Sequence, residues 1–198
     1  MKNIIFDLGG VILKDKPISV LDNFNIDGKT YDLLKAFFDD WKKLDLGEET
    51  LEDKYKQCNF PKEYDGLYKS ILIYYYKYRE IDKRLIDCIN QLKHNGYNIY
   101  VLSDNIKECF EYFKSLPAFK DIDGWTVSCD YHATKSDGDL FDIFIESFNL
   151  NPSECYFIDN NISIIEEAQK HGINGSTFKT SDDIDKLYSD LRNNKINI

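Results

Sequence analysis

Three short apolar runs in this sequence each end at a polar residue, and this repeated pattern constrains the fold more than any other feature. The runs, with the residues that end them, are Asn3–Phe6 with Asp7, Asn98–Leu102 with Ser103, and Cys155–Ile158 with Asp159. A short apolar run that stops at turn-forming residues is typical of a buried strand. The pattern therefore predicts buried strands that each place a polar side chain at their carboxyl end.

Amphipathic segments lie between and after the expected strands. Apolar residues recur at helical spacing over 81–92, where Gly96 is placed to end the helix, and over 140–148, before the third strand. Two further helices are expected over 164–172 and 181–191. Strands that alternate with helices predict an α/β fold with a doubly wound parallel sheet. Ligands of such sheets bind at the carboxyl ends of the strands.

The segment over residues 15–80 shows helical periodicity without a strand-like run. Its apolar positions at helical spacing are Leu33, Leu34, Phe37, Phe38 and Trp41, and then Leu67, Ile71, Tyr75 and Tyr78. Between these two stripes, Thr50 with Asp53 three residues later indicates the start of a helix. We therefore expect two domains: an α/β core formed by residues 1–14 and 81–198, and a helical cap over 15–80 that can cover the strand ends.

Charge and cysteine usage exclude several classes of protein. The 25 Lys and Arg residues are outnumbered by 35 Asp and Glu residues, and the net charge of −10 repels nucleic acid and anionic lipid, so neither is expected as a partner. The apolar stretch over 4–13 is short and contains Asp7, which argues against a signal peptide or a membrane span and favours a cytoplasmic protein. The five cysteines are widely spaced, which predicts free thiols rather than a disulfide framework or a zinc site. The oligomeric state is not indicated.

Four residues form a chemically coherent group: Asp7, Ser103, Lys135 and Asp159. A carboxylate attacks phosphorus only where the negative charge of the phosphate is screened by a metal cation, a positive side chain and neutral hydrogen-bond donors. These four residues can supply the nucleophile, a donor, the positive charge and a metal ligand. The group therefore predicts phosphoryl-transfer chemistry at the strand ends.

The chain resembles the haloacid dehalogenase (HAD) superfamily, and within it the phosphatase-like members that carry a helical cap after the first motif. The matching segments are IIFDLGGVIL, YVLSDN, Lys135 within TKSDGDLFDIF, and YFIDNNISIIEEAQKHGI, and WKKLDLGEET resembles the corresponding turn of the cap. The motifs occur in the family's order and cover nearly the whole chain. The resemblance implies a HAD-like α/β core with a helical-bundle cap.

The resemblance also implies a role for each matched residue. Asp7 would be the nucleophile that forms an aspartyl-phosphate, and Asp7, Asp159 and the carbonyl of Gly9 would hold Mg2+. Ser103 would hydrogen-bond the transferred phosphoryl group, and Lys135 would neutralise the nucleophile and the phosphate. Gly10 would permit the tight turn beside the phosphate. The implied activity is that of a Mg2+-dependent phosphatase acting on a small phosphorylated metabolite.

Three positions depart from the family pattern. Most HAD phosphatases carry a second Asp two residues after the nucleophile, and here Gly9 keeps the metal-binding carbonyl but supplies no proton donor. General acid–base catalysis is worth about 10²- to 10⁴-fold, so we expect slow turnover or a leaving group that needs little help. Asn160 replaces the second acid of the fourth motif, and Asp104 follows Ser103 where Asn is usual. Asp104 can partly replace the missing acid, repel a phosphate, or cap the next helix.

Two other functions fit the sequence. In a dehalogenase-like hydrolase Asp7 would attack carbon and halide would leave without a proton, although relatives of that kind use no metal and carry an aromatic residue in place of Gly9. A catalytically weak HAD fold could also serve as a binding or regulatory module. Candidates for reading the substrate from the cap side are Lys14, Lys16, Trp41, Lys42 and Lys43, for each of which a surface or packing role is the simpler interpretation.

Overall fold

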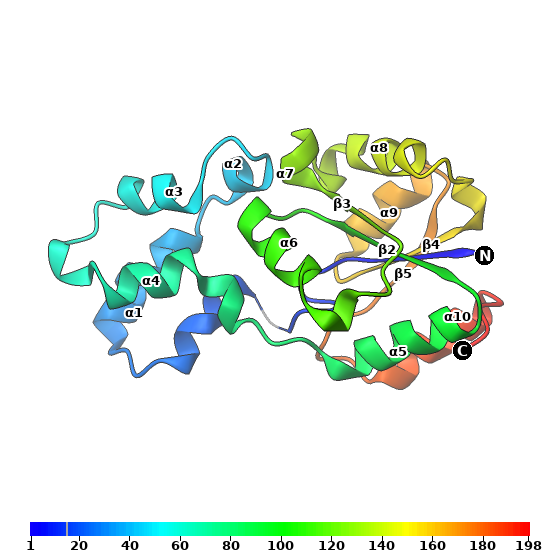
Figure 1. Ribbon diagram of the computed structural model, residues 1–198, viewed down its shortest axis with the longest axis horizontal. Helices are drawn as coiled ribbons and strands as arrows, with labels where there is room; N and C mark the ends of the chain where they lie inside the picture. Colours follow the sequence, from blue (N-terminus) through cyan, green and yellow to red (C-terminus); the bar gives the residue numbers. More distant parts are fainter. Residues whose placement is uncertain (15) are drawn as a thin grey trace.

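The computed structural model describes residues 1–14 and 16–198, and it contains a parallel sheet with helices on both faces (Figure 1). The strands are β1 (Asn3–Phe6), β2 (Asn98–Ser103), β3 (Gly124–Val127), β4 (Cys155–Asp159) and β5 (Asn174–Thr177). Their order across the sheet is β3-β2-β1-β4-β5. The predicted α/β class and the three predicted strands are confirmed, except that Ser103 and Asp159 are the last residues of their strands rather than the first residues beyond them.

The register of the sheet brings the carboxyl ends of the three central strands together. Phe6 pairs with Val101 on one side and with Ile158 on the other, so β1 lies between β2 and β4. The backbone N–H of Asp7 continues this ladder and donates to the carbonyl of Ile158 at 2.9 Å. Asp7 therefore emerges between the ends of its two neighbouring strands.

Alternate residues of the strands pack against different helices. Ile4 and Phe6 belong to an apolar cluster that includes residues of α5 (Lys83–His94), α6 (Lys107–Lys114) and α10 (Ile184–Asn193). Ile5 belongs to a second cluster with α8 (Asp139–Ser147) and α9 (Ile162–Lys170). The remaining elements of this part are α7 (Ser128–Tyr131) and the 3-10 turns Pro117–Phe119, Lys135–Asp137 and Pro152–Glu154. In the described ranges no helix has the length and apolarity needed to cross a membrane.

Short helices make up the described residues from 16 to 80 and form a group at one side of the sheet, on the left of Figure 1. They are α1 (Gly28–Leu34), α2 (Lys42–Asp45), α3 (Leu51–Gln57) and α4 (Leu67–Ile73), with 3-10 turns at Pro17–Asn23, Lys35–Phe38, Lys62–Tyr64 and Tyr75–Tyr78. The helix start expected at Thr50 is confirmed, because its hydroxyl accepts from the backbone N–H of Asp53. The division into a core and a cap domain stays a prediction.

Several expected helices have other limits in the structure. The stripe over 33–41 is not one helix: α1 ends at Leu34, a 3-10 turn follows, and Trp41 precedes α2. The helix expected over 81–92 begins at Lys83, because Asp82 caps it and Ile81 instead forms a bridge with Leu13. The last helix spans Ile184–Asn193 rather than 181–191.

Candidate active site

A cavity of about 660 Å³ lies at the carboxyl ends of β1, β2 and β4. The sheet side of the cavity contributes Asp7, Gly9, Gly10, Asp104, Lys135 and Asp159, all of them residues singled out in the sequence. Ser103 is only 1% exposed and is not among the described residues that line the cavity. The structure thus brings the matched motifs together, and the buried Ser103 hydroxyl lies next to the carboxylate of Asp7.

The ammonium group of Lys135 joins the two carboxylates that end β1 and β4. Lys135 Nζ lies 2.9 Å from Asp7 Oδ1 and 2.7 Å from Asp159 Oδ2. All three side chains are at most 8% exposed. Buried charges are tolerated in proteins when they are paired, and Lys135 pairs with both carboxylates and also donates a hydrogen bond to Asp159.

Burial and these ion pairs shift the pKa values of Asp7 and Lys135. Burial raises the pKa of Asp7 to about 6, with Lys135 opposing the rise, Asp159 adding to it, and the hydroxyl of Ser103 favouring the charged form. For Lys135, burial alone would lower the pKa, but Asp7 and Asp159 hold it well above its usual value. The lysine therefore stays charged across the physiological range, and it is available to neutralise an anion in the cavity.

Asp104 is held by the turn that carries Lys135. Its Oδ1 accepts the backbone N–H of Lys135 at 2.9 Å, and burial raises its pKa, with Lys135 opposing the rise. The helix that follows is capped at Ile106 without a side-chain bond, so the interpretation of Asp104 as a helix cap is wrong. Asp104 lines the cavity and does not bond the start of α6, because its carboxylate accepts the backbone N–H of Lys135.

The turn after β1 depends on glycine. Gly10 has a φ of +77°, a conformation that residues with a Cβ rarely adopt, and a Cβ there would collide with the side chain of Asn160. Asn160 Nδ2 donates to the carbonyl of Gly9 at 3.2 Å. Asn161 caps α9, because its side chain accepts the backbone N–H of Ser163. The turn and the end of β4 are thus packed directly on each other.

The oxygen atoms around the triad suit a hard divalent cation. Asp7 and Asp159 offer carboxylates and Gly9 offers a carbonyl, and Mg2+ prefers oxygen ligands and retains several waters beside one or two carboxylates. Over residues 1–14 and 16–198 there is no group of three or more His, Cys, Asp or Glu side chains placed to hold a metal. The donor set therefore fits Mg2+ rather than a metal that is enclosed by side chains.

The helical segment contributes the opposite wall of the cavity. Of the five candidates named from the sequence, Lys16 and Trp41 line it, whereas Lys42 and Lys43 do not and Lys14 forms an ion pair with Glu80 at 3.2 Å. Trp41 packs edge-on against Tyr75, which also lines the cavity. Sequence reasoning missed Asp45, Arg79 and Lys179 as lining residues. The segment WKKLDLGEET held the signal for Asp45, since the resemblance already marked it as a turn of the cap.

Asp45 is the one acidic residue that the helical segment adds to the described cavity wall. Burial raises its pKa to about 7; the negative charge of Asp104 adds to the rise, Lys135 opposes it, and Asp7 contributes a further increase. Within residues 1–14 and 16–198 its carboxylate has no hydrogen bond or ion pair. A carboxyl group in this state is present in both protonation forms near neutral pH.

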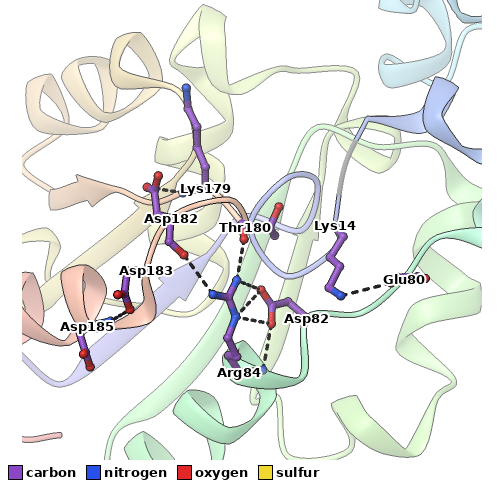
Figure 2. Close-up of polar contacts among 9 residues, drawn as sticks. All are labelled: Lys14, Glu80, Asp82, Arg84, Lys179, Thr180, Asp182, Asp183 and Asp185. Carbon is purple, nitrogen blue, oxygen red and sulfur yellow. Dashed lines mark hydrogen bonds and ion pairs between the residues drawn. The ribbon is translucent and has the colours of Figure 1, made fainter.

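The loop after β5 forms a further wall and is held by Arg84 (Figure 2). The guanidinium of Arg84 donates to the carbonyls of Thr180 at 2.6 Å and Asp182 at 3.1 Å, and it pairs with Asp82 at 2.6 Å. The backbone N–H of Thr180 in turn donates to the carbonyl of Gly10 at 3.2 Å. A larger hollow of about 1170 Å³ lies along Asp82 and Arg84, and none of the four residues with predicted chemistry lines it.

The chain was compared with models of known protein families and with curated proteins. A family model described as haloacid dehalogenase-like hydrolase matches residues 1–172. No curated protein matches the chain.

Solved structures of the same kind share the fold. A HAD family enzyme from Bacteroides thetaiotaomicron, in complex with magnesium and inorganic phosphate, is 20% identical with a TM-score of 0.71, over 95% of this chain and 99% of the other. A predicted HAD-like family hydrolase from Porphyromonas gingivalis is 20% identical with a TM-score of 0.71, and the match covers 97% of this chain and 98% of the other. An L-2-haloacid dehalogenase from Xanthobacter autotrophicus, with chloropropionic acid covalently bound, is 14% identical with a TM-score of 0.68. The match covers 100% of this chain and 85% of the other.

Proposed function

This chain belongs to the haloacid dehalogenase-like hydrolase family, and we propose that within it the chain is a Mg2+-dependent phosphatase of a small phosphorylated metabolite. One observation carries the proposal: Lys135 joins Asp7 to Asp159 inside a cavity whose oxygen ligands suit Mg2+. A nucleophilic carboxylate next to a fixed positive charge and a cation site is what attack on a phosphate ester requires.

In the proposed reaction Asp7 is the nucleophile. Its carboxylate oxygen forms a bond to phosphorus while the bond from phosphorus to the alcohol oxygen breaks, which leaves an aspartyl-phosphate. Water then attacks the same phosphorus, the bond to Asp7 breaks, and inorganic phosphate leaves. Lys135 neutralises Asp7 and the phosphoryl oxygens throughout, and Ser103 hydrogen-bonds the phosphoryl group. Gly10 keeps the turn close to that group.

Three groups would hold the metal: the carboxylates of Asp7 and Asp159, and the carbonyl of Gly9. A bound Mg2+ supplies positive charge that stabilises the phosphoryl oxygens as they gain negative charge. Support comes from the HAD family enzyme of Bacteroides thetaiotaomicron, which shares this fold and was crystallised with magnesium and inorganic phosphate. The cavity of about 660 Å³ has the size of a site for a small molecule.

A dehalogenase-like hydrolase is the second candidate. Gly9 favours it, because a halide leaves without a proton and a missing donor does no harm. The chloropropionic acid complex of the Xanthobacter enzyme shows that this fold can hold such chemistry in that protein. The two candidates differ in their use of metal, which makes them separable.

The test is an assay of phosphate release from sugar, nucleotide and aryl phosphates, with and without Mg2+, on wild type and Asp7→Asn. Halide release from 2-haloacids is measured in parallel. The proposal expects phosphate release that needs both Mg2+ and Asp7. Metal-independent halide release that needs Asp7 would establish the second candidate instead.

A further inference from the structure

The turn after β1 supplies no proton donor for the leaving oxygen. A phosphatase that acts on an alkyl phosphate needs such a donor. Gly9 has no side chain to give a proton. The acidic residues that line the described part of the cavity are Asp7, Asp45, Asp104 and Asp159. Among the described residues, these four carboxyl groups are the acidic candidates for protonating the leaving oxygen.

Three of the four carboxylates already have an ion-pair or hydrogen-bond partner. Lys135 pairs with Asp7 and Asp159, and Asp159 also accepts the backbone N–H of Asn161 at 2.8 Å. Asp104 accepts the backbone N–H of Lys135. A donor that binds a carboxylate favours the charged form, which cannot give a proton. The carboxylate of Asp45 has no such partner within the described ranges.

Resting on the phosphatase proposed above, we infer that Asp45, from the helical segment, is the general acid and base that replaces the side chain missing at Gly9. In the first step the Asp45 carboxyl gives its proton to the alcohol oxygen as that oxygen separates from phosphorus. In the second step the Asp45 carboxylate takes a proton from the water that attacks the aspartyl-phosphate. Each cycle returns Asp45 to its protonated form and Asp7 to its carboxylate.

The position of Asp45 suits this role. In an in-line displacement the leaving oxygen lies on the side of phosphorus opposite the nucleophile. Asp7 extends from β1, whereas Asp45 ends α2 on the helical wall of the same cavity. A phosphoryl group attacked by Asp7 therefore turns its leaving group toward the wall that carries Asp45.

The turn after Asp45 is fixed to the sheet side of the molecule, where α2 lies beside α7 (Figure 1). The ring of His132, just after α7, has Nδ1 2.6 Å from the carbonyl of Leu46. Gly47 approaches the carbonyl of Cys129 so closely that a Cβ would collide with it. These contacts on the two residues after Asp45 hold its backbone at the cavity, and a proton donor needs such fixed placement.

The charges that face Asp45 allow both protonation states. Asp104 and Asp7 disfavour its charged form and Lys135 favours it, so its pKa of about 7 lies near the pH at which the enzyme would work. The other charged residues in the described lining of the cavity are Asp159, Lys16, Arg79 and Lys179. A group with this pKa can both give and take a proton during one cycle.

The experiment compares two substrates with different leaving groups, an alkyl phosphate and 4-nitrophenyl phosphate, for wild type and Asp45→Asn. The leaving alkoxide of the alkyl phosphate needs a proton, and nitrophenolate does not. We expect Asp45→Asn to lower kcat on the alkyl phosphate about 10²- to 10⁴-fold. With 4-nitrophenyl phosphate the first step should persist while the second slows, which gives a burst of one nitrophenolate per enzyme molecule before slow turnover.

Two further variants make the test specific. Glu48→Gln removes an exposed carboxylate from the same turn, and it should behave as wild type. Gly9→Asp restores an acid after β1, where a Cβ meets nothing within 4 Å. Adding Gly9→Asp to Asp45→Asn should recover hydrolysis of the alkyl phosphate, which also shows that the Asp45→Asn protein is folded.

The outcomes separate this inference from the proposed function. For Asp45→Asn in an enzyme that still needs Asp7 and Mg2+, two results overturn the role of Asp45 alone. One is a first step that slows equally on both substrates, so that no nitrophenolate burst appears, and the other is unchanged kinetics. The leaving-group effect appearing in Asp104→Asn instead would overturn it in favour of Asp104. A wild type that hydrolyses no phosphate ester in an Asp7-dependent way overturns the phosphatase itself.

Discussion

Lys135 Nζ lies 2.9 Å from Asp7 Oδ1, and both side chains are almost completely buried. Asp7 directly follows β1, and Lys135 begins the 3-10 turn that comes after β3 and α7. The ion pair therefore links distant parts of the chain at the point where we place the chemistry. It also makes Lys135 important to stability as well as to activity.

Lys135→Met should destabilise the protein by about 3 to 5 kcal/mol, because it leaves Asp7 and Asp159 buried without their positive partner. Phosphate release should fall to background in the same variant. Chemical denaturation at neutral pH measures the first effect. Lys170→Met is the matched control: its pair with Glu167 is at the surface, where such pairs contribute about 0 to 1 kcal/mol. Equal loss of stability in both variants would contradict the importance of the buried pair.

Asp45→Asn should make the metal-free protein more stable at pH 8. The folded pKa of Asp45, about 7, is above the ordinary value of 3.8, so the folded protein holds this proton more tightly than the unfolded chain does. The free energy of unfolding of wild type therefore falls as pH rises from about 4 to 7, and Asn removes this loss. We expect a gain on the order of 2 kcal/mol at pH 8 that disappears near pH 4. Thermal denaturation in EDTA at both pH values measures it, and a constant difference would argue against the shifted pKa.

Asp82→Asn should destabilise the protein at pH 6 and much less below pH 4. Asp82 caps α5 and pairs with Arg84, and these contacts outweigh burial and lower its pKa below the ordinary 3.8. Its contribution is thus present above pH of about 4 and is lost as pH falls through the folded pKa. We expect a loss of about 1 to 3 kcal/mol at pH 6. Asp87→Asn removes an exposed carboxylate from the same helix, and as the control it should leave the stability at pH 6 nearly unchanged.

Two adjacent glycines should respond differently to alanine. Gly10→Ala should cost about 1 to 3 kcal/mol, because its φ of +77° is strained for a side chain and the new Cβ meets Asn160. Gly9→Ala should change the free energy of unfolding by less than half of that, since its Cβ position is open. Urea denaturation of the two variants compares them directly. Similar costs would show that the turn does not depend on Gly10 in the way described.

The part of the fold that sequence could predict is the part with a strong local signal. Strands β1, β2 and β4 are continuous apolar runs because both of their faces are covered by helices. The edge strands β3 and β5, with the sequences GWTV and NGST, were missed because neither is a continuous apolar run. Their strand character comes from pairing with β2 and β4.

The residues of the candidate site also differ in whether the sequence could predict them. Asp7, Lys135 and Asp159 could be predicted, because motifs at strand ends meet at one edge of a parallel sheet. Asp45 could not be placed from its spacing, because its position depends on contacts of Leu46 and Gly47 with residues more than 80 positions later in the chain. Lys42 and Lys43 precede it in the same short helix, but they are exposed and are not among the described residues that line the cavity.

The measurement that tests the central claim most directly is the mass of the protein itself during turnover. Wild type is mixed with 4-nitrophenyl phosphate and Mg2+, quenched with acid, and examined by intact-protein and peptide mass spectrometry. The account predicts a gain of one phosphoryl group, located on Asp7, that is absent without Mg2+ and in Asp7→Asn. Steady release of phosphate with no phosphoryl group on Asp7, or equal release by Asp7→Asn, would contradict it.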